Sequence, residues 1–221
     1  MMWDVLVSPF TEFQFMRAAL VSVVFLALSA APVGVFLVIR RMSLMGDALS
    51  HAVLPGAAAG YMLAGLSVPA MSLGGFIAGV VMAVLAGLVS RFTPFKEDAR
   101  FAAFYLSSLA LGVLMVSRGG NNVDLLNLLF GSILGIDTAS LALIASVASV
   151  SLVALAVMYR PLVMESIDAL FLRAVGGKGS WWHLLFMLLV VLNLVAGFQA
   201  LGTLMSVGLV LLPALGARSW S

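Results

Sequence analysis

A carboxylate and an imidazole lie four residues apart in a segment that is otherwise apolar. Asp47 and His51 form this pair, and Pro55 follows after four more residues. Residues four apart share one face of a helix, and an ionisable group inside a membrane segment is expensive and usually functional. Carboxylates and imidazoles are both ligands for zinc and manganese. The pair therefore indicates a metal site, a proton relay or a structural pair.

Pro55 bears on the same site. A proline within a helix removes the hydrogen bond to the carbonyl four residues earlier, and that carbonyl belongs to His51. We therefore expect a kink at which His51 offers both an imidazole and a free backbone oxygen, as in the ion sites of transporters with broken helices.

Structural roles explain the same two residues without a ligand. Asp47 lies near the start of its span, where an acid favours the helix dipole, and His51 could hydrogen-bond inside the bundle. One chain also supplies only two ligands. A two-fold dimer would supply two Asp and two His, which is the number that zinc requires.

The composition shows what must position these residues. Of the 221 residues, 63% are hydrophobic and 9% are charged, whereas a soluble domain carries about 25% charged residues. The chain therefore needs a lipid bilayer, in which backbone groups must be satisfied within helices. We expect an all-α fold, a polytopic transmembrane helical bundle of about six or seven spans, forming a single domain over residues 1–221.

Seven apolar runs are long enough to be candidate spans. They are Ala18–Ile39, Leu44–Leu63, Val68–Val89, Phe101–Ser117, Ala139–Tyr159, Trp181–Ala200 and Leu201–Ala217. The first is expected to be a true span, because Asp4 and Glu12 precede it where a signal peptide carries positive charge. The last two form one run broken by Gly202, which indicates either two short spans or a span with a re-entrant piece.

The basic residues predict the orientation, because Lys and Arg concentrate in cytoplasmic loops. With the loop of Arg40 and Arg41 inside, alternating spans place nine of the 11 Lys and Arg residues in the cytoplasm and leave Arg17 and Arg118 outside. The N-terminus is then outside. Residues 161–180 become a cytoplasmic segment, in which a short amphipathic helix is expected to end at Gly176.

Other polar and small residues have plainer interpretations. Asn193 and Gln199 are expected to hydrogen-bond between helices, and His183 to anchor the chain at the interface beside two tryptophans. Two glycine pairs, Gly56 with Gly60 and Gly75 with Gly79, favour close helix packing within one bundle over a dimer face.

Several function classes are excluded or lack support. The chain contains no cysteine, which excludes disulfides, thiolate metal sites and cysteine nucleophiles. It has no phosphate loop, no His-Glu-x-x-His and no Gly-x-Ser-x-Gly sequence. No basic stripe with interleaved aromatics suggests nucleic acid.

The segment from Met42 to Gly56 closely resembles the signature of the zinc/manganese permease family of ABC transporters. The resemblance continues, in the expected order, through five further stretches. These are residues 97–99, 129–135, 167–176, 199–204 and 211–214.

The resemblance implies a multi-pass permease of a bacterial-type cell (inner) membrane, paired with a second copy of itself. It implies cytoplasmic ATP-binding subunits that hydrolyse ATP, so the permease itself is not an enzyme, and an extracytoplasmic metal-binding protein that delivers the ion. Asp47 and His51 would bind the transported metal. No permanently bound cofactor is implied.

The cytoplasmic segment is similar to the coupling helix of the family, which docks in the ATPase. The residues that fit this pattern are Asp168, Phe171, Arg173, Ala174 and Gly176, whereas Ile167, Ala169 and Leu170 depart from it. Family members usually continue beyond the Pro213-Ala214 segment, so the chain is expected to lack their final span or spans.

These observations lead to one main hypothesis and two alternatives. The main hypothesis is the permease subunit of an ATP-driven importer for a divalent transition metal, with zinc weakly favoured over manganese. A proton-coupled carrier would use the same Asp47–His51 pair without an ATPase. A non-transporting membrane scaffold would use the pair structurally and bind no metal.

Overall fold

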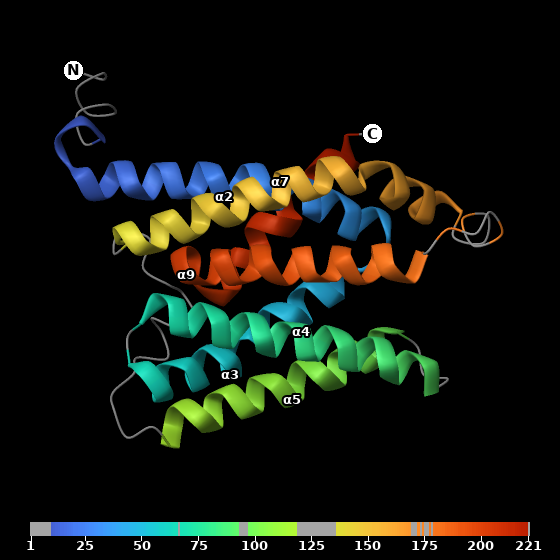
Figure 1. Ribbon diagram of the computed structural model, residues 1–221, viewed down its shortest axis with the longest axis horizontal. Coiled ribbons are helices and arrows are strands. Elements are labelled where there is room, and N and C mark those ends of the chain that lie inside the picture. The colour runs from blue at the N-terminus through green and yellow to red at the C-terminus, as the bar shows by residue number, and fades with distance from the viewer. Residues whose placement is uncertain are drawn as a thin grey trace.

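The computed structural model is helical throughout the part of the chain that it describes. The described residues are 10–65, 67–92, 97–118, 136–168, 172, 174, 177 and 179–220, and none of them lies in a strand. The long helices are α2 (Gln14–Ile39), α3 (Ser43–Ala64), α4 (Val68–Phe92), α5 (Glu97–Arg118), α7 (Thr138–Ile167) and α9 (Gly179–Ser219) (Figure 1). The expected all-α fold is confirmed.

Four helical stretches are long and apolar enough to cross a membrane. They are Gln14–Ile39, Val68–Leu85, Thr138–Ile167 and Trp181–Ser219, and Ala103–Met115 of α5 is a shorter apolar stretch. Helix α3 is not among the four, although it has 22 residues. It is the helix that contains Asp47 and His51. The chain is a multi-pass membrane protein.

Helix α9 reverses direction at Gly202. This glycine has φ 74° and ψ 177°, outside the helical region. The hydroxyl of Ser206 donates to the carbonyl of Leu194 at 3.5 Å, although twelve residues of straight helix would span about 18 Å. The run therefore forms two antiparallel helices, and the second packs its Val210 backbone against Gly34 of α2.

Helix α7 extends further than the apolar run indicated. The expected span ended at Tyr159, but the helix continues through Pro161 to Ile167 and ends at the cap residue Asp168. The start of the 161–180 segment is thus a continuation of α7. Beyond it, the amide of Leu172 donates to the carbonyl of Asp168 at 3.2 Å, as in a helical turn.

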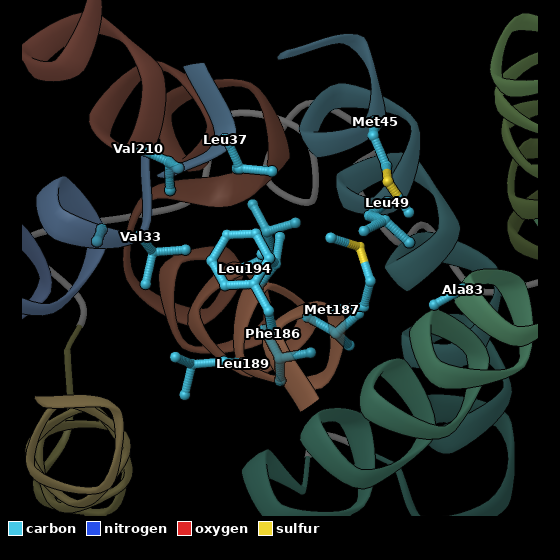
Figure 2. Packing of buried hydrophobic residues seen from close by; sticks show 14 of the residues in the cluster. Val33, Leu37, Met45, Leu49, Ala83, Phe186, Met187, Leu189, Leu194 and Val210 are labelled. Atoms are coloured by element: carbon cyan, nitrogen blue, oxygen red, sulfur yellow. The ribbon is translucent and has the colours of Figure 1, made fainter. Parts of the chain in front are cut away.

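The helices form two groups of three that meet at α9. Helices α2, α7 and α9 pack together, as do α3, α4 and α5, and α9 also contacts α3 and α4 (Figure 1). The core lies at this junction. Figure 2 shows Met45 and Leu49 of α3 pointing toward Phe186, Met187 and Leu194 of α9.

Glycines allow α3 and α4 to touch backbone to backbone. A Cβ atom at Gly56 would collide with the carbonyl oxygen of Gly74, and one at Gly60 with that of Ala70. Both glycines therefore serve packing within one chain, which was the favoured interpretation. Gly75 and Gly79 likewise face side chains of this chain, on α3 and α9.

A rigid turn joins α2 to α3. The amide of Arg41 donates to the carbonyl of Val38 at 3.1 Å, and that of Met42 to the carbonyl of Leu37 at 2.9 Å. This is the Schellman pattern, which places the residue after the cap in the left-handed region. Arg41 accordingly has φ 58°. The chain leaves α2 at a fixed angle and enters α3 at Ser43.

Candidate functional site

Helix α3 separates its apolar residues from its ionisable pair. Asp47 and His51 lie two positions away from Met45 and Leu49, which is about 200° around a helix, so the pair faces away from the core of Figure 2. At 1.5 Å per residue, His51 lies about 12 Å along the helix from its start. The pair is therefore inside the helix rather than in the loop before it.

The two side chains are near each other but differ in exposure. His51 Nε2 lies 3.7 Å from Asp47 Oδ1, which is longer than a hydrogen bond. The His51 side chain is 5% exposed, and that of Asp47 is 43% exposed within a single chain. The arrangement leaves the carboxylate accessible and holds the imidazole in the protein interior.

One nitrogen of His51 has no protein partner. Nδ1 is buried and makes no hydrogen bond. A buried polar atom left without a partner costs about 1–3 kcal/mol, so its retention requires an explanation, and metal ligation is one that suits imidazole. Among the described residues there is no cluster of three or more His, Asp or Glu side chains. A single chain thus brings together two candidate protein ligands here, Asp47 and His51.

The carbonyl of His51 has the partner that Pro55 makes necessary. The helix continues through Pro55, and the hydroxyl of Ser108 on α5 donates to the His51 carbonyl oxygen at 3.4 Å. Gly112, one turn further along α5, lies against Leu54 and Pro55, because a Cβ there would be 3.2 Å from Leu54 Cβ. Helix α5 therefore packs directly over the proline.

An aromatic ring from α5 completes the surroundings of the imidazole. The rings of Tyr105 and His51 meet edge to face, with centroids 4.7 Å apart and planes at 88°. Tyr105 and Ser108 are three residues apart and so lie on one face of α5. Sequence reasoning did not single out either residue. A short polar side chain inside an apolar span was the available signal for Ser108.

Asn193 and Gln199 each hydrogen-bond to a neighbouring helix, as expected, although Asn193 Oδ1 is buried without a partner. Asn193 Nδ2 donates to Ser151 Oγ on α7 at 2.8 Å and to the carbonyl of Leu189 at 2.9 Å. Gln199 Nε2 donates to Ser72 Oγ on α4 at 2.9 Å. Neither residue is brought to Asp47 by these contacts.

The residues predicted to couple to an ATPase are described only in part. Asp168 caps the end of α7 and is exposed, and Ala174 is also exposed. Phe171, Arg173 and Gly176 lie outside the described residues, as do the family-like residues 129–135. The contacts of the coupling segment therefore stay a prediction.

Comparisons with known proteins agree on one family. Residues 12–221 match the ABC 3 transport family. The manganese import system permease protein ScaB of Streptococcus gordonii is 32% identical over 207 residues, covering 92% of this chain and 72% of the relative. The manganese transport system membrane protein MntC of Halalkalibacterium halodurans is 31% identical over 203 residues, covering 91% and 68%.

Two solved structures share the fold. PsaBC from Streptococcus pneumoniae, in complex with Fab, superposes with a TM-score of 0.85 at 31% identity, covering 96% of this chain and 75% of that chain. An inward-facing conformation of a putative metal-chelate type ABC transporter gives a TM-score of 0.72 at 16% identity, covering 97% and 81%. The second likeness concerns the fold alone.

Proposed function

This chain belongs to the ABC 3 transport family, and from that premise we propose that it is the permease subunit of an ATP-driven importer whose cargo is manganese. The observation that carries the proposal is the Asp47–His51 pair. A buried imidazole with an unpartnered nitrogen lies one turn from a half-exposed carboxylate, inside a helix of a membrane bundle.

Manganese replaces zinc as the favoured cargo. The count of two His and two Asp in a dimer favoured zinc, but relatives in four genera are named for manganese. Manganese prefers more oxygen ligands than zinc does. The half-exposed carboxylate of Asp47 supplies such oxygens, and a second copy of the chain would supply another.

In the proposed mechanism the ion passes through the Asp47–His51 pair. A metal ion delivered by an extracytoplasmic binding protein would be held by the Asp47 carboxylate and the His51 imidazole. ATP bound to separate cytoplasmic subunits would shift the permease between outward-facing and inward-facing states. The segment after α7, containing Asp168 and Ala174, would receive that motion. The cargo leaves when the two copies of the pair no longer face it together.

The experiment is metal uptake into vesicles that hold the chain with its ATP-binding subunits. We compare manganese and zinc, with and without ATP, in the wild type and in Asp47→Asn and His51→Ala. Loss of one ligand is expected to lower ATP-dependent manganese uptake at least about tenfold. His183→Ala is the matched control, because it removes the other histidine of the chain and should leave uptake unchanged.

Each other result selects a different function. Uptake that is indifferent to ATP would replace the proposal with a proton-coupled carrier. Folded protein that neither binds nor transports metal would indicate a structural pair in a scaffold. Uptake that survives substitution of both Asp47 and His51 would show that these two residues do not bind the transported metal.

A further inference from the structure

Arg40, at the end of α2, joins three helices in one buried cluster. One terminal guanidinium nitrogen donates to Glu165 Oε2 at 2.9 Å and to the carbonyl of Leu162 at 3.3 Å, and Nε donates to Ser166 Oγ at 3.1 Å. The guanidinium carbon lies 5.0 Å from the centroid of the Phe186 ring on α9. The side chains of Arg40 and Glu165 are only 7% and 14% exposed.

Stability alone does not account for this cluster. Removing two charges from water costs about as much as their attraction returns, and well-packed apolar residues often serve equally well. The planar fork of Arg is suited to a fixed geometry with several acceptors. Here it holds three acceptors in the last two turns of α7, and Ser166 additionally donates to the Leu162 carbonyl at 2.6 Å. The cluster thus fixes how α2 and α7 sit relative to each other.

On one side, Arg40 is rigidly connected to the candidate site. Its own amide donates to the carbonyl of Phe36 at 3.0 Å, which closes the end of α2. The Schellman turn follows, and the amides of Met45 and Gly46 then donate to the carbonyl of Met42 at 3.1 and 3.4 Å. Hydrogen-bonded backbone therefore runs from Arg40 to the first turn of α3, which ends directly before Asp47.

On the other side, Glu165 and Ser166 lie in the last turn of α7, directly before Asp168. A displacement of this helix end would move the acceptors of Arg40. We propose that Arg40 is a positioning residue for transport, which passes motion from the end of α7 to the α2–α3 turn and so to Asp47 and His51. This rests on the proposed function, which assigns the motor to the segment after α7 and the cargo to the pair.

The test measures coupling rather than folding. In vesicles holding the complete transporter, we determine the manganese ions transported per ATP hydrolysed for Arg40→Gln, Glu165→Gln and the double variant. Arg40→Gln is expected to lower this ratio about tenfold, the scale of coupling losses in such networks, while ATP hydrolysis continues. Glu165→Gln should act in the same direction, and the double variant should fall no further than Arg40→Gln.

Arg41→Gln is the matched control, because Arg41 carries the same charge in the same turn and its side chain is exposed. Its transport ratio should equal that of the wild type. An unchanged ratio in Arg40→Gln and Glu165→Gln, or losses that add fully in the double variant, would overturn the inference. If Arg40→Gln does not assemble, Glu165→Gln alone tests the role of Arg40. This variant is expected to fold, because the glutamine amide has the same size as the glutamate carboxylate.

The wild type separates this inference from the function on which it rests. ATP-independent uptake, or no uptake, in the wild type would contradict both the proposed function and the inference that rests on it. ATP-driven uptake in the wild type, with an unchanged number of manganese ions transported per ATP in the variants, would contradict only the role of Arg40.

Discussion

At the scale of single residues, His51 is held by two contacts, one to its backbone and one to its ring. Its backbone carbonyl accepts from Ser108, and its ring meets the ring of Tyr105. Both contacts come from α5, so the position of the candidate ligand depends on a second helix. A substitution at Ser108 can measure how much its hydrogen bond to the His51 carbonyl stabilises the fold.

Ser108→Ala is expected to lower the free energy of unfolding by about 1–2 kcal/mol, because it leaves the His51 carbonyl buried without a donor. The measurement is unfolding of the purified protein in detergent. Ser107→Ala is the matched control: Ser107 is exposed and donates within its own helix, to the carbonyl of Ala103 at 2.8 Å. Equal stability of the two variants would contradict the structural role of Ser108.

The sequence predicted one half of the candidate site and missed the other. Asp47, His51 and the His51 carbonyl could be proposed from the sequence because helical periodicity and proline chemistry act within a few residues of one another, but the carbonyl accepts from Ser108 and is not free. Ser108 could not be matched to His51 in the same way, because 57 residues separate them and only packing brings them together. Arg40 was assigned to a cytoplasmic loop, and its pairing with Glu165, 125 residues away, was invisible for the same reason.

At the scale of helices, the expected spans were placed within a few residues of the observed helices. Apolar length decides where a helix can cross lipid, so boundaries such as those of α3 and α4 followed from composition. The differences between expected and observed helices lie at the end of α7 and after Gly202. Helix α7 passes Pro161 because the polar residues beyond it have partners, as the bond of Ser166 to the Leu162 carbonyl shows. The direction of the chain after Gly202 depended on a backbone angle that composition does not specify.

The contact of α3 with α4 depends on the absence of a side chain at Gly56. Gly56→Ala is expected to lower the free energy of unfolding by about 1–3 kcal/mol, because the new Cβ would force the α4 backbone away at Gly74. Gly216→Ala is the control, since nothing lies within 4 Å of a Cβ there. It should stabilise the helix by up to about 1 kcal/mol. Comparable unfolding midpoints for the two variants would refute the close contact.

Helix α7 begins with a charged cap outside its apolar span. Asp137 Oδ1 accepts from the amide of Ser140 at 2.8 Å, and hydrogen bonding to Ser140 lowers the pKa of this carboxyl below its ordinary value. The ionised form is thus favoured in the folded protein. Its contribution is complete above the unfolded-state pKa of about 3.9 and is lost as the pH falls through the lower, folded-state pKa.

Asp137→Ala is therefore expected to cost about 1 kcal/mol at neutral pH, whereas Asp137→Asn, which can still cap, should cost less. Thermal unfolding in detergent at neutral and at acidic pH measures both variants against the wild type. The difference in unfolding temperature between the wild type and Asp137→Asn should become smaller as the pH falls through the folded-state pKa of Asp137. An unfolding-temperature difference that grows in acid would contradict the direction of the pKa shift.

At the scale of the whole molecule, the course of the helices agrees with the distribution of charge. Helices α2 to α7 cross in alternating directions (Figure 1), and the reversal at Gly202 adds one more crossing, which returns the chain end with Arg218 to the side of Arg40. A continuous α9 would have placed Arg218 on the opposite side. The reversal is therefore consistent with an orientation in which the Arg40 end of the bundle is cytoplasmic.

This orientation can be measured residue by residue, because the chain contains no cysteine. We introduce one cysteine at a time, at Thr138, the first residue of α7, or at Ser219 after the reversal, both of which are exposed, and apply a membrane-impermeant thiol reagent to intact cells. Thr138→Cys should react from outside, whereas Ser219→Cys should react only after the membrane is opened. The cysteine-free chain is the control for background labelling. Labelling of Ser219→Cys in intact cells would place Ser219 outside. Either the reversal at Gly202 or the cytoplasmic position of Arg40 would then be wrong. If Arg40 were not cytoplasmic, the proposed route of motion to Asp47 would be wrong as well.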